Sequence, residues 1–196
     1  MATYDARTAL AVVDVQNDFA DPTGSLYVSG GEDIVPFVNS EIGKALGAGA
    51  LVVFTQDWHP PSTPHFAKDG GVWPVHCVRE TRGAAFHRAL RFVEGAPVVR
   101  KGGGGEDGYS GFTVVDPSTG QRAATELGRV LSERGVARLI IVGLATDYCV
   151  RDTALDAAAL GFVAGVLRDG VRAVDMKPGD GDAAFAAMRA AGVTLE

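Results

Sequence analysis

Apolar residues along the chain fall into short, nearly unbroken runs, separated by longer segments in which they recur at helical spacing. Runs of aliphatic residues without regular polar interruption are typical of strands that are covered on both faces in a parallel sheet. The sequence therefore predicts buried strands at Thr8–Val15, Ala50–Thr55, Pro97–Lys101, Arg138–Leu144 and Phe162–Arg168.

Between these runs, apolar residues recur with a helical period in segments that are each followed by a glycine, a common helix terminator. These segments cover 34–46, 123–131, 150–160 and 183–191, and a short last strand is expected at 193–195. Strands alternating with helices imply right-handed crossovers in a parallel sheet. The predicted fold class is α/β: one domain over residues 1–196, a three-layer sandwich with a mostly parallel central sheet flanked by helices.

The segment from Asp57 to Arg100 breaks this alternation. It is rich in proline, glycine, histidine and tryptophan and shows little periodicity. A long irregular segment inside a compact domain is usually functional.

Charge and composition narrow the class of protein. The 196 residues carry a net charge of −6, which disfavours both nucleic acid and anionic membrane surfaces as partners. No stretch approaches the ~20 apolar residues of a membrane span, and the start lacks a signal-peptide core, so a cytoplasmic location is expected. The two cysteines, Cys77 and Cys149, make no disulfide framework; each is either a small buried hydrophobe or a working thiol.

Reactive side chains follow four of the predicted strands. Because ligands bind at the carboxyl ends of the strands in open parallel sheets, these side chains are expected to share one rim. They are Asp14 and Asp18, Asp57 and His59, Lys101, and Thr146, Asp147 and Cys149. Carboxylates, an imidazole, an ammonium and a thiol are the groups from which hydrolase sites are built.

Cys149 lies between a buried strand and a helix. The positive end of a helix dipole favours a thiolate, so the sequence predicts a lowered pKa for this thiol. Asp14 ends the apolar run of the first strand, where a carboxylate needs a partner, and Lys101 ends the third. On adjacent strands these residues would form a base, a cation and a nucleophile. The plainer interpretations are a core cysteine for Cys149 and a solvated charge for Lys101.

Three of the four histidines lie in the irregular segment, which begins with an aspartate. Asp57 and His59 are two residues apart and point the same way in an extended chain, and His65 and His76 follow. Imidazole and carboxylate ligands suit Zn, Fe or Mn, so a transition-metal site is predicted in preference to a polar loop with chance histidines. His87 is expected at the surface.

Glycines at 103, 105 and 108 match the spacing of a dinucleotide-binding loop. That fingerprint requires a helix to begin at the loop, whereas the segment after Gly108 has no helical stripe and reaches Pro117. A nucleotide role is rejected, and the segment is interpreted as a flexible loop that covers a substrate.

The motifs taken together resemble the nicotinamidases of the isochorismatase-like cysteine hydrolase superfamily, in order from Ala9 to about Asp156. The matching segments are Asp14-Val15-Gln16-Asn17-Asp18-Phe19, Gly24-Ser25-Leu26, Gly30-Gly31, Asp57-Trp58-His59-Pro60, Trp73-Pro74-Val75-His76-Cys77-Val78, Lys101-Gly102, Tyr109-Ser110-Gly111-Phe112 and Gly143 through Val150. The run of glycines after Lys101 departs from the family pattern and leaves the shape of the pocket lid open.

The resemblance implies a site and a reaction. It implies a catalytic triad of Asp14, Lys101 and Cys149, and an oxyanion hole formed by the amides of Ala145 and Cys149 after a cis peptide bond. Phe19, Trp73 and Tyr109 are expected to contact the substrate, and Asp57, His59, His65 and His76 to hold one divalent transition metal (Zn, Fe or Mn). The implied reaction is hydrolysis of nicotinamide to nicotinate and ammonia through a thioester, a step of NAD salvage.

Two other interpretations stay open. The same scaffold could act on another small amide, such as a carbamoyl or ureido acid; metal content separates these, because those relatives need no metal. A flavodoxin-like protein that binds phosphate with its glycine-rich loop would retain a nucleotide and would not show one rapidly alkylated cysteine. The expected partner is a small-molecule amide, with no nucleic acid and no membrane, and a homo-oligomer is compatible with the sequence.

Overall fold

A six-stranded parallel sheet forms the centre of the computed structural model, which describes residues 2–196. The strand order is β3-β2-β1-β6-β7-β8, and every neighbouring pair is parallel. The strands of this sheet are β1 (Thr8–Val13), β2 (Leu51–Asp57), β3 (Val98–Lys101), β6 (Arg138–Leu144), β7 (Val163–Arg172) and β8 (Thr194–Leu195). The α/β prediction is confirmed.

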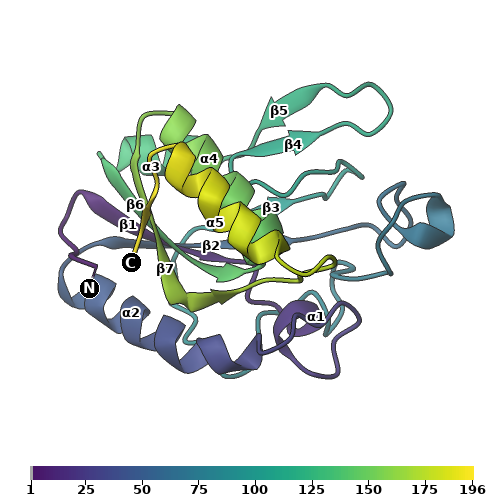
Figure 1. Ribbon diagram of the computed structural model, residues 1–196, viewed down its shortest axis with the longest axis horizontal. Coiled ribbons are helices and arrows are strands. Elements are labelled where there is room, and N and C mark those ends of the chain that lie inside the picture. Colours follow the sequence, from purple (N-terminus) through teal and green to yellow (C-terminus); the bar gives the residue numbers. More distant parts are fainter. Residues whose placement is uncertain (1) are drawn as a thin grey trace.

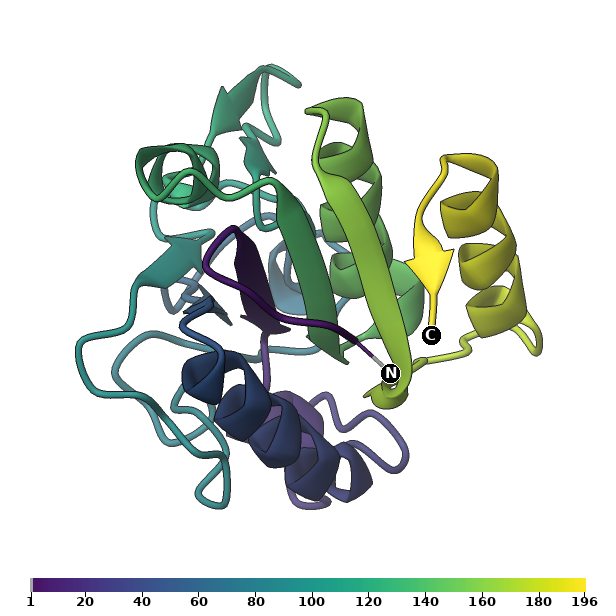
Figure 2. The same ribbon diagram turned by 90° about the vertical axis from the view of Figure 1, so that its left-hand side faces the viewer.

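Helices cover both faces of the sheet and complete three layers (Figure 1, Figure 2). The main helices are α2 (Val35–Gly47), α3 (Leu127–Glu133), α4 (Arg151–Ala159) and α5 (Asp180–Ala190), with a short α1 (Asn17–Ala20) after β1. On one face, α2 packs on strand residues such as Leu10 and Val12. On the other face, α3, α4 and α5 pack on Ala9, Ala11 and Val13. The alternation along β1 follows from successive side chains pointing to opposite faces of a strand.

The strand order determines what meets at the carboxyl edge of the sheet. Lys101 ends β3, Asp57 ends β2, Asp14 follows β1 and Cys149 follows β6. These four strands are consecutive neighbours in the sheet. Residues far apart in the chain therefore converge at this edge.

The long irregular segment between β2 and β3 contains, among its regular elements, only the 3₁₀ turn Ala67–Asp69 within the described residues. Gln16 links this segment to the end of β2. Its amide nitrogen donates to the carbonyls of Asp57 and Ala84 at 2.8 and 2.9 Å, and its carbonyl accepts from the amide of Asp57. Gln56 also donates to the carbonyl of Ala84, at 2.8 Å, so buried amide side chains hold this segment with little secondary structure against the strand ends.

Several element boundaries differ from the sequence prediction, among them those of β1, α3 and β7. β1 ends at Val13 because Asp14 has φ +49°, outside the strand region. Residues 123–124 belong to an antiparallel hairpin, β4 (Thr113–Val115) with β5 (Arg122–Ala124), so α3 starts at Leu127. β7 continues to Arg172 past exposed polar residues.

In the part of the chain that the structure describes, no helix has the length and hydropathy to cross a membrane.

Candidate active site

Lys101 lies at the centre of a buried charge cluster. Its Nζ is 2.8 Å from Asp14 Oδ2, donates a hydrogen bond to Asp57 Oδ1 and lies 3.6 Å from Cys149 Sγ. The side chain is 1% exposed, so the interpretation of Lys101 as a solvated strand-end charge is wrong. A buried ammonium between two carboxylates keeps its proton, and the pKa of Lys101 is accordingly raised because these two anions outweigh its burial.

The two carboxylates differ in their ionisation. Burial raises the pKa of Asp14, and the charge of Lys101 opposes that rise. For Asp57 burial acts in the same direction, but the charge of Lys101, together with the nearby His59 ring, outweighs it, so its pKa lies below the usual range. Thr55 Oγ1 donates to Asp14 Oδ1 at 2.6 Å and helps to orient it. Asp14 is therefore the carboxylate better suited to accept a proton. Asp57 is the carboxylate that stays ionised.

Cys149 lies in a π-helical turn, Thr146–Val150, between β6 and α4. Cys149 Sγ and one carboxylate oxygen from each of Asp14 and Asp57 all lie within 4.8 Å of one another. Burial raises the pKa of the Cys149 thiol well above its ordinary value, and Lys101 only partly offsets the rise. The prediction of a lowered pKa is thus wrong for the free site: with the side chain almost fully buried, desolvation outweighs the favourable charge. The neutral thiol of Cys149 must therefore lose its proton to Asp14 before its sulfur can act as a nucleophile.

Cys77 contrasts with Cys149. It is fully buried in the apolar cluster beneath α2, and burial raises its pKa as well. Its amide donates to Asp18 Oδ2 at 2.7 Å, and Asp18 Oδ1 accepts from the amide of Ser25. Asp18 therefore holds loops in place and is not among the residues that line the pocket described below.

Three buried histidines form a second cluster, in which one ring nitrogen of each lies within 4.8 Å of the others. His76 Nδ1 pairs with the carbonyl of Pro74 at 2.7 Å, and His65 Nδ1 pairs with Asp107 Oδ1 at 2.8 Å. Each of these rings therefore has its Nε2 left for a ligand. Neither ring nitrogen of the buried His59 has a hydrogen-bond partner in the described residues.

The orphaned nitrogens of His59 indicate a missing ligand, since buried polar atoms are normally paired. A side chain at Gly102 would meet His59 Nδ1 at 2.6 Å, so that nitrogen faces backbone, while Nε2 lies 3.8 Å from Asp57 Oδ2. The residues present thus fit one divalent transition metal, with imidazole nitrogens and a carboxylate as donors. Asp57 joins both clusters, because its other oxygen contacts Lys101.

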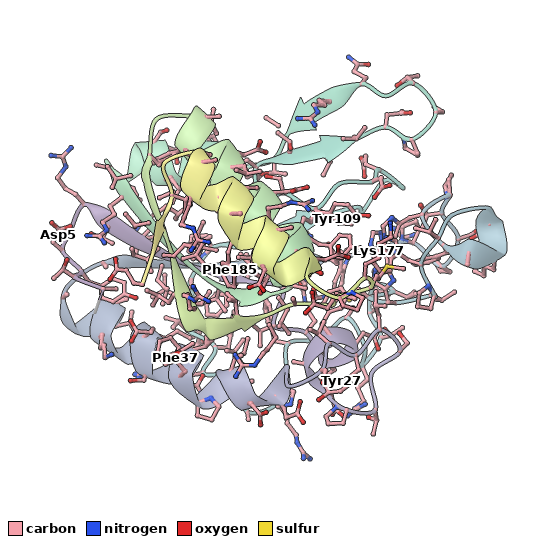
Figure 3. The ribbon with its side chains drawn as sticks, in the orientation of Figure 1. Asp5, Tyr27, Phe37, Tyr109, Lys177 and Phe185 are labelled. Atoms are coloured by element: carbon pink, nitrogen blue, oxygen red, sulfur yellow. The ribbon has the colours of Figure 1, made fainter. Side chains whose placement is uncertain are left out.

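A pocket opens beside both clusters, and Figure 3 shows the side chains of this region with Tyr109 labelled. Its lining includes Asp57, His65, His76, Ala145 and Cys149 together with Phe19, Trp73 and Tyr109. Trp73 Nε1 donates to the Tyr109 hydroxyl at 3.0 Å, which fixes two of the aromatic walls. The Leu144–Ala145 peptide bond is cis, as the resemblance implies. The predicted catalytic, metal and substrate residues are therefore brought together in one place.

The loop after β7 closes the pocket from another side through Val174. Asp147, buried in the turn that carries Cys149, accepts the amides of Val174 and Asp175, both at 2.9 Å. Tyr148 is a fourth aromatic residue of the lining, with its ring centroid 5.0 Å from that of Trp73 and 5.1 Å from that of Tyr109. The nucleophile turn and the pocket wall are thus one connected unit.

Comparison with known proteins identifies the family. A family model described as the Isochorismatase domain matches residues 8–196. The chain belongs to the isochorismatase family. A nicotinamidase of Escherichia coli (strain K12) is 39% identical to this isochorismatase-family chain over 203 aligned positions, covering 95% of this chain and 93% of that protein.

Solved structures agree with the assignment to the isochorismatase family. The pyrazinamidase of Pyrococcus horikoshii in complex with zinc has a TM-score of 0.87 and 41% identity, covering 97% of this chain and 98% of that chain. PnC1 from L. infantum in complex with nicotinate has a TM-score of 0.88 and 35% identity, covering 100% of this chain and 95% of that chain.

The sequence did not indicate the roles of four residues of this site: Thr55, Asp107, Asp147 and Tyr148. Thr55 lies inside a strand whose polar position looked incidental, and Tyr148 was only a neighbour of the cysteine. Asp147 was placed at the rim without a role. Asp107 lies in the glycine-rich segment, where no periodicity predicts which way a side chain points, and only the antiparallel pairing with Val115 directs it to His65.

Proposed function

We propose that this chain is a metal-containing cysteine amidohydrolase that converts nicotinamide to nicotinate and ammonia. The observation that carries the proposal is the position of Asp57, which contacts Lys101 of the charge cluster and faces His59 of the histidine cluster. A thiol, a base and a metal site thereby border one aromatic pocket. A flat aromatic amide with a ring nitrogen matches these features: its carboxamide suits the thiol and base, its ring nitrogen the metal site, and its ring the aromatic pocket.

The reaction starts from a neutral thiol. Asp14 accepts the proton of Cys149, and Lys101 stabilises the thiolate that forms. Sγ then attacks the carboxamide carbon. The amides of Ala145 and Cys149, in the turn that borders the pocket, are assigned to the negatively charged oxygen of the tetrahedral intermediate.

The second half of the reaction releases both products. Asp14 returns its proton to the nitrogen as the C–N bond breaks, ammonia leaves, and a thioester remains on Cys149. Asp14 then accepts a proton from water, whose oxygen attacks the thioester carbon. Nicotinic acid leaves and loses its proton to solvent as nicotinate, and the proton held by Asp14 restores the Cys149 thiol.

The aromatic walls orient the substrate. Phe19 and Trp73 enclose the ring, and the hydrogen bond from Trp73 to Tyr109 keeps the wall rigid. Asp57, His59, His65 and His76 would hold the metal. When bound, the metal supplies a Lewis acid that holds the ring nitrogen and so positions the carboxamide at Cys149.

The proposal is tested by incubating the purified chain with nicotinamide, pyrazinamide, a carbamoyl acid and a ureido acid, measuring ammonia and metal content on the same sample. Ammonia from the two aromatic amides, and about one metal per chain, are expected. Chelation should remove both metal and activity, and His59→Ala should lower both.

His87→Ala is the matched control, because His87 lies outside the histidine cluster. It should retain metal and activity. A fully active metal-free preparation, or ammonia from the carbamoyl or ureido acid alone, would assign the chain to another amidase reaction of the same family.

A further inference from the structure

The carboxylate of Asp107 is the one acidic partner of His65 within the described residues. Asp107 Oδ1 lies 2.8 Å from His65 Nδ1 and also accepts the amide of Gly108 at 2.7 Å. An acceptor at Nδ1 requires the proton on that nitrogen in the neutral ring, which leaves the lone pair on Nε2.

The backbone of Asp107 is held as firmly as its side chain. Its amide donates to the carbonyl of Val115 at 2.7 Å, and its carbonyl accepts from the amide of Val115 at 2.6 Å. Val115 is the last residue of β4, which pairs with β5 through three residues on each strand. The hairpin therefore fixes where the Asp107 carboxylate lies.

From this geometry we propose that Asp107 is a positioning residue for the metal site. It selects the Nδ1–H tautomer of His65 and holds the ring so that Nε2 faces His59 and His76. The inference rests on the proposed function only for the presence of a metal. Carboxylates behind metal-binding histidines commonly contribute 10–100-fold to affinity, roughly the effect expected here.

This assignment gives the β4–β5 hairpin a role. The hairpin lies outside the six-stranded sheet, and the residues that line the pocket do not include its strands. Through Asp107 it braces His65 from the side opposite the metal. Movement of the hairpin would thus change metal affinity without any change in a ligand.

The test compares wild type with Asp107→Asn and Asp107→Ala. Each protein is stripped of metal, and its Zn²⁺ dissociation constant is measured by competition with a chelating dye. We expect Ala to weaken Zn²⁺ binding by about 10–100-fold, and Asn by less, because its carbonyl still accepts from Nδ1–H. In ¹⁵N spectra of the metal-free protein, the neutral His65 should be the Nδ1–H tautomer in wild type and lose that preference in the Ala variant.

Asp116→Asn is the matched control. Asp116 caps the turn of the same hairpin by accepting the amides of Ser118 and Thr119, and within residues 2–196 none of its hydrogen bonds involves a histidine. The Zn²⁺ affinity of this variant should stay within about twofold of wild type. That is well short of the change expected when a metal-binding histidine loses its carboxylate partner. Equal losses in Asp116→Asn and Asp107→Ala, or an unchanged Asp107→Ala, overturn the role of Asp107.

A wild-type protein that binds no Zn²⁺ and releases no ammonia from nicotinamide would instead overturn the proposed function, and the role of Asp107 with it. A wild type that binds Zn²⁺ with the same affinity as Asp107→Ala overturns only the role of Asp107. The two failures are therefore distinguishable.

Discussion

The buried cluster at the strand ends combines one cation, Lys101, with two carboxylates, those of Asp14 and Asp57. With both carboxylates ionised the group carries one excess negative charge, which is costly in a site almost without solvent. A proton on Asp14 or a cation beside Asp57 relieves that charge. The site is therefore suited both to take up a proton from Cys149 and to hold a metal.

Replacement of the nucleophile should separate the two cysteines. Cys149→Ala should abolish ammonia release while leaving the unfolding midpoint nearly unchanged, because no other thiol borders the pocket. Cys77→Ala should keep most of the activity, since Cys77 packs in the core. Steady-state assays and chemical unfolding of both variants check this, and equal loss of activity in the two would contradict a single nucleophile.

The charged partners of Cys149 should differ in their effect on the reactivity of the thiol. Lys101 lowers the pKa of Cys149 and Asp14 raises it. In Lys101→Met the pKa should rise further, so alkylation by iodoacetamide should become slower near neutral pH. In Asp14→Asn alkylation should persist although turnover falls by about 10²–10⁴-fold, the usual contribution of a general base.

The measurement is the alkylation rate against pH for wild type and both variants. Lys101→Met leaves two buried carboxylates unpaired, so its folding is checked first by circular dichroism. A folded Lys101→Met protein with the wild-type alkylation profile would remove Lys101 from the proposed triad.

Among the elements, β6 carries the tightest backbone contact near the site. Gly143 has φ +120°, and a Cβ there would lie 2.0 Å from the carbonyl oxygen of Val13. The pairing of β6 with β7 shifts register at the same point. The glycine thus permits the close approach of β6 to β1 just before the chain turns toward Cys149.

Gly143→Ala should therefore lower the free energy of unfolding by more than the cost of placing alanine at a positive φ. Gly49→Ala is the matched control, because Gly49 also has a positive φ, +72°, but no atom within 4 Å of its added Cβ. The control should cost about 1–2 kcal/mol, the penalty for a left-handed residue, and Gly143→Ala at least about 2 kcal/mol more. Urea unfolding measures both, and equal losses would show that β6 moves away from Val13 at little cost.

Elements with a strong period were predictable from sequence, and elements without one were not. The five strand runs and the α2 stripe appear close to their predicted places because burial on both faces, or on one helical face, leaves a clear pattern. The β4–β5 hairpin was missed because its strands have three residues each, too few to show alternation. Ala123 was assigned to a helix because alanine fits a helical stripe as well as a strand.

The site shows the same division. Asp14, Lys101 and Cys149 follow strands, so parallel topology alone predicts that they meet. The interactions of Asp107 and Asp147 come from loops whose paths depend on tertiary contacts, and no local pattern encodes them. The pKa of Cys149 depends on burial, which position at a helix start does not reveal.

For the molecule as a whole, the stability of the metal-free protein should depend on pH through His76. Burial lowers the pKa of His76 from 6.5 to about 4. Between these values the unfolded chain binds more protons than the folded one, so stability falls as pH decreases from 6.5 to 4 and is constant above 6.5 for this group. The total loss should be on the order of 3 kcal/mol, reached once His76 of the folded protein is protonated as well, below about pH 4.

His76→Gln tests this contribution by difference. Urea unfolding of chelator-treated wild type and variant at several values of pH should show a smaller decline in the variant between pH 6.5 and 4. Parallel curves for the two proteins would mean that His76 does not contribute to the pH dependence.

The placement of β1 beside β6 also determines when the catalytic residues come together as the chain is made. Thr8 pairs with Arg138, so β1 is synthesised well before its neighbour β6. Pairings of such long sequence separation form slowly. Addition of β6 beside β1 brings the turn of Cys149 to Asp14 and Lys101 in the same step. A growing chain therefore contains its base and cation early but acquires its nucleophile only when β6 joins the sheet, before β7 and β8 are added.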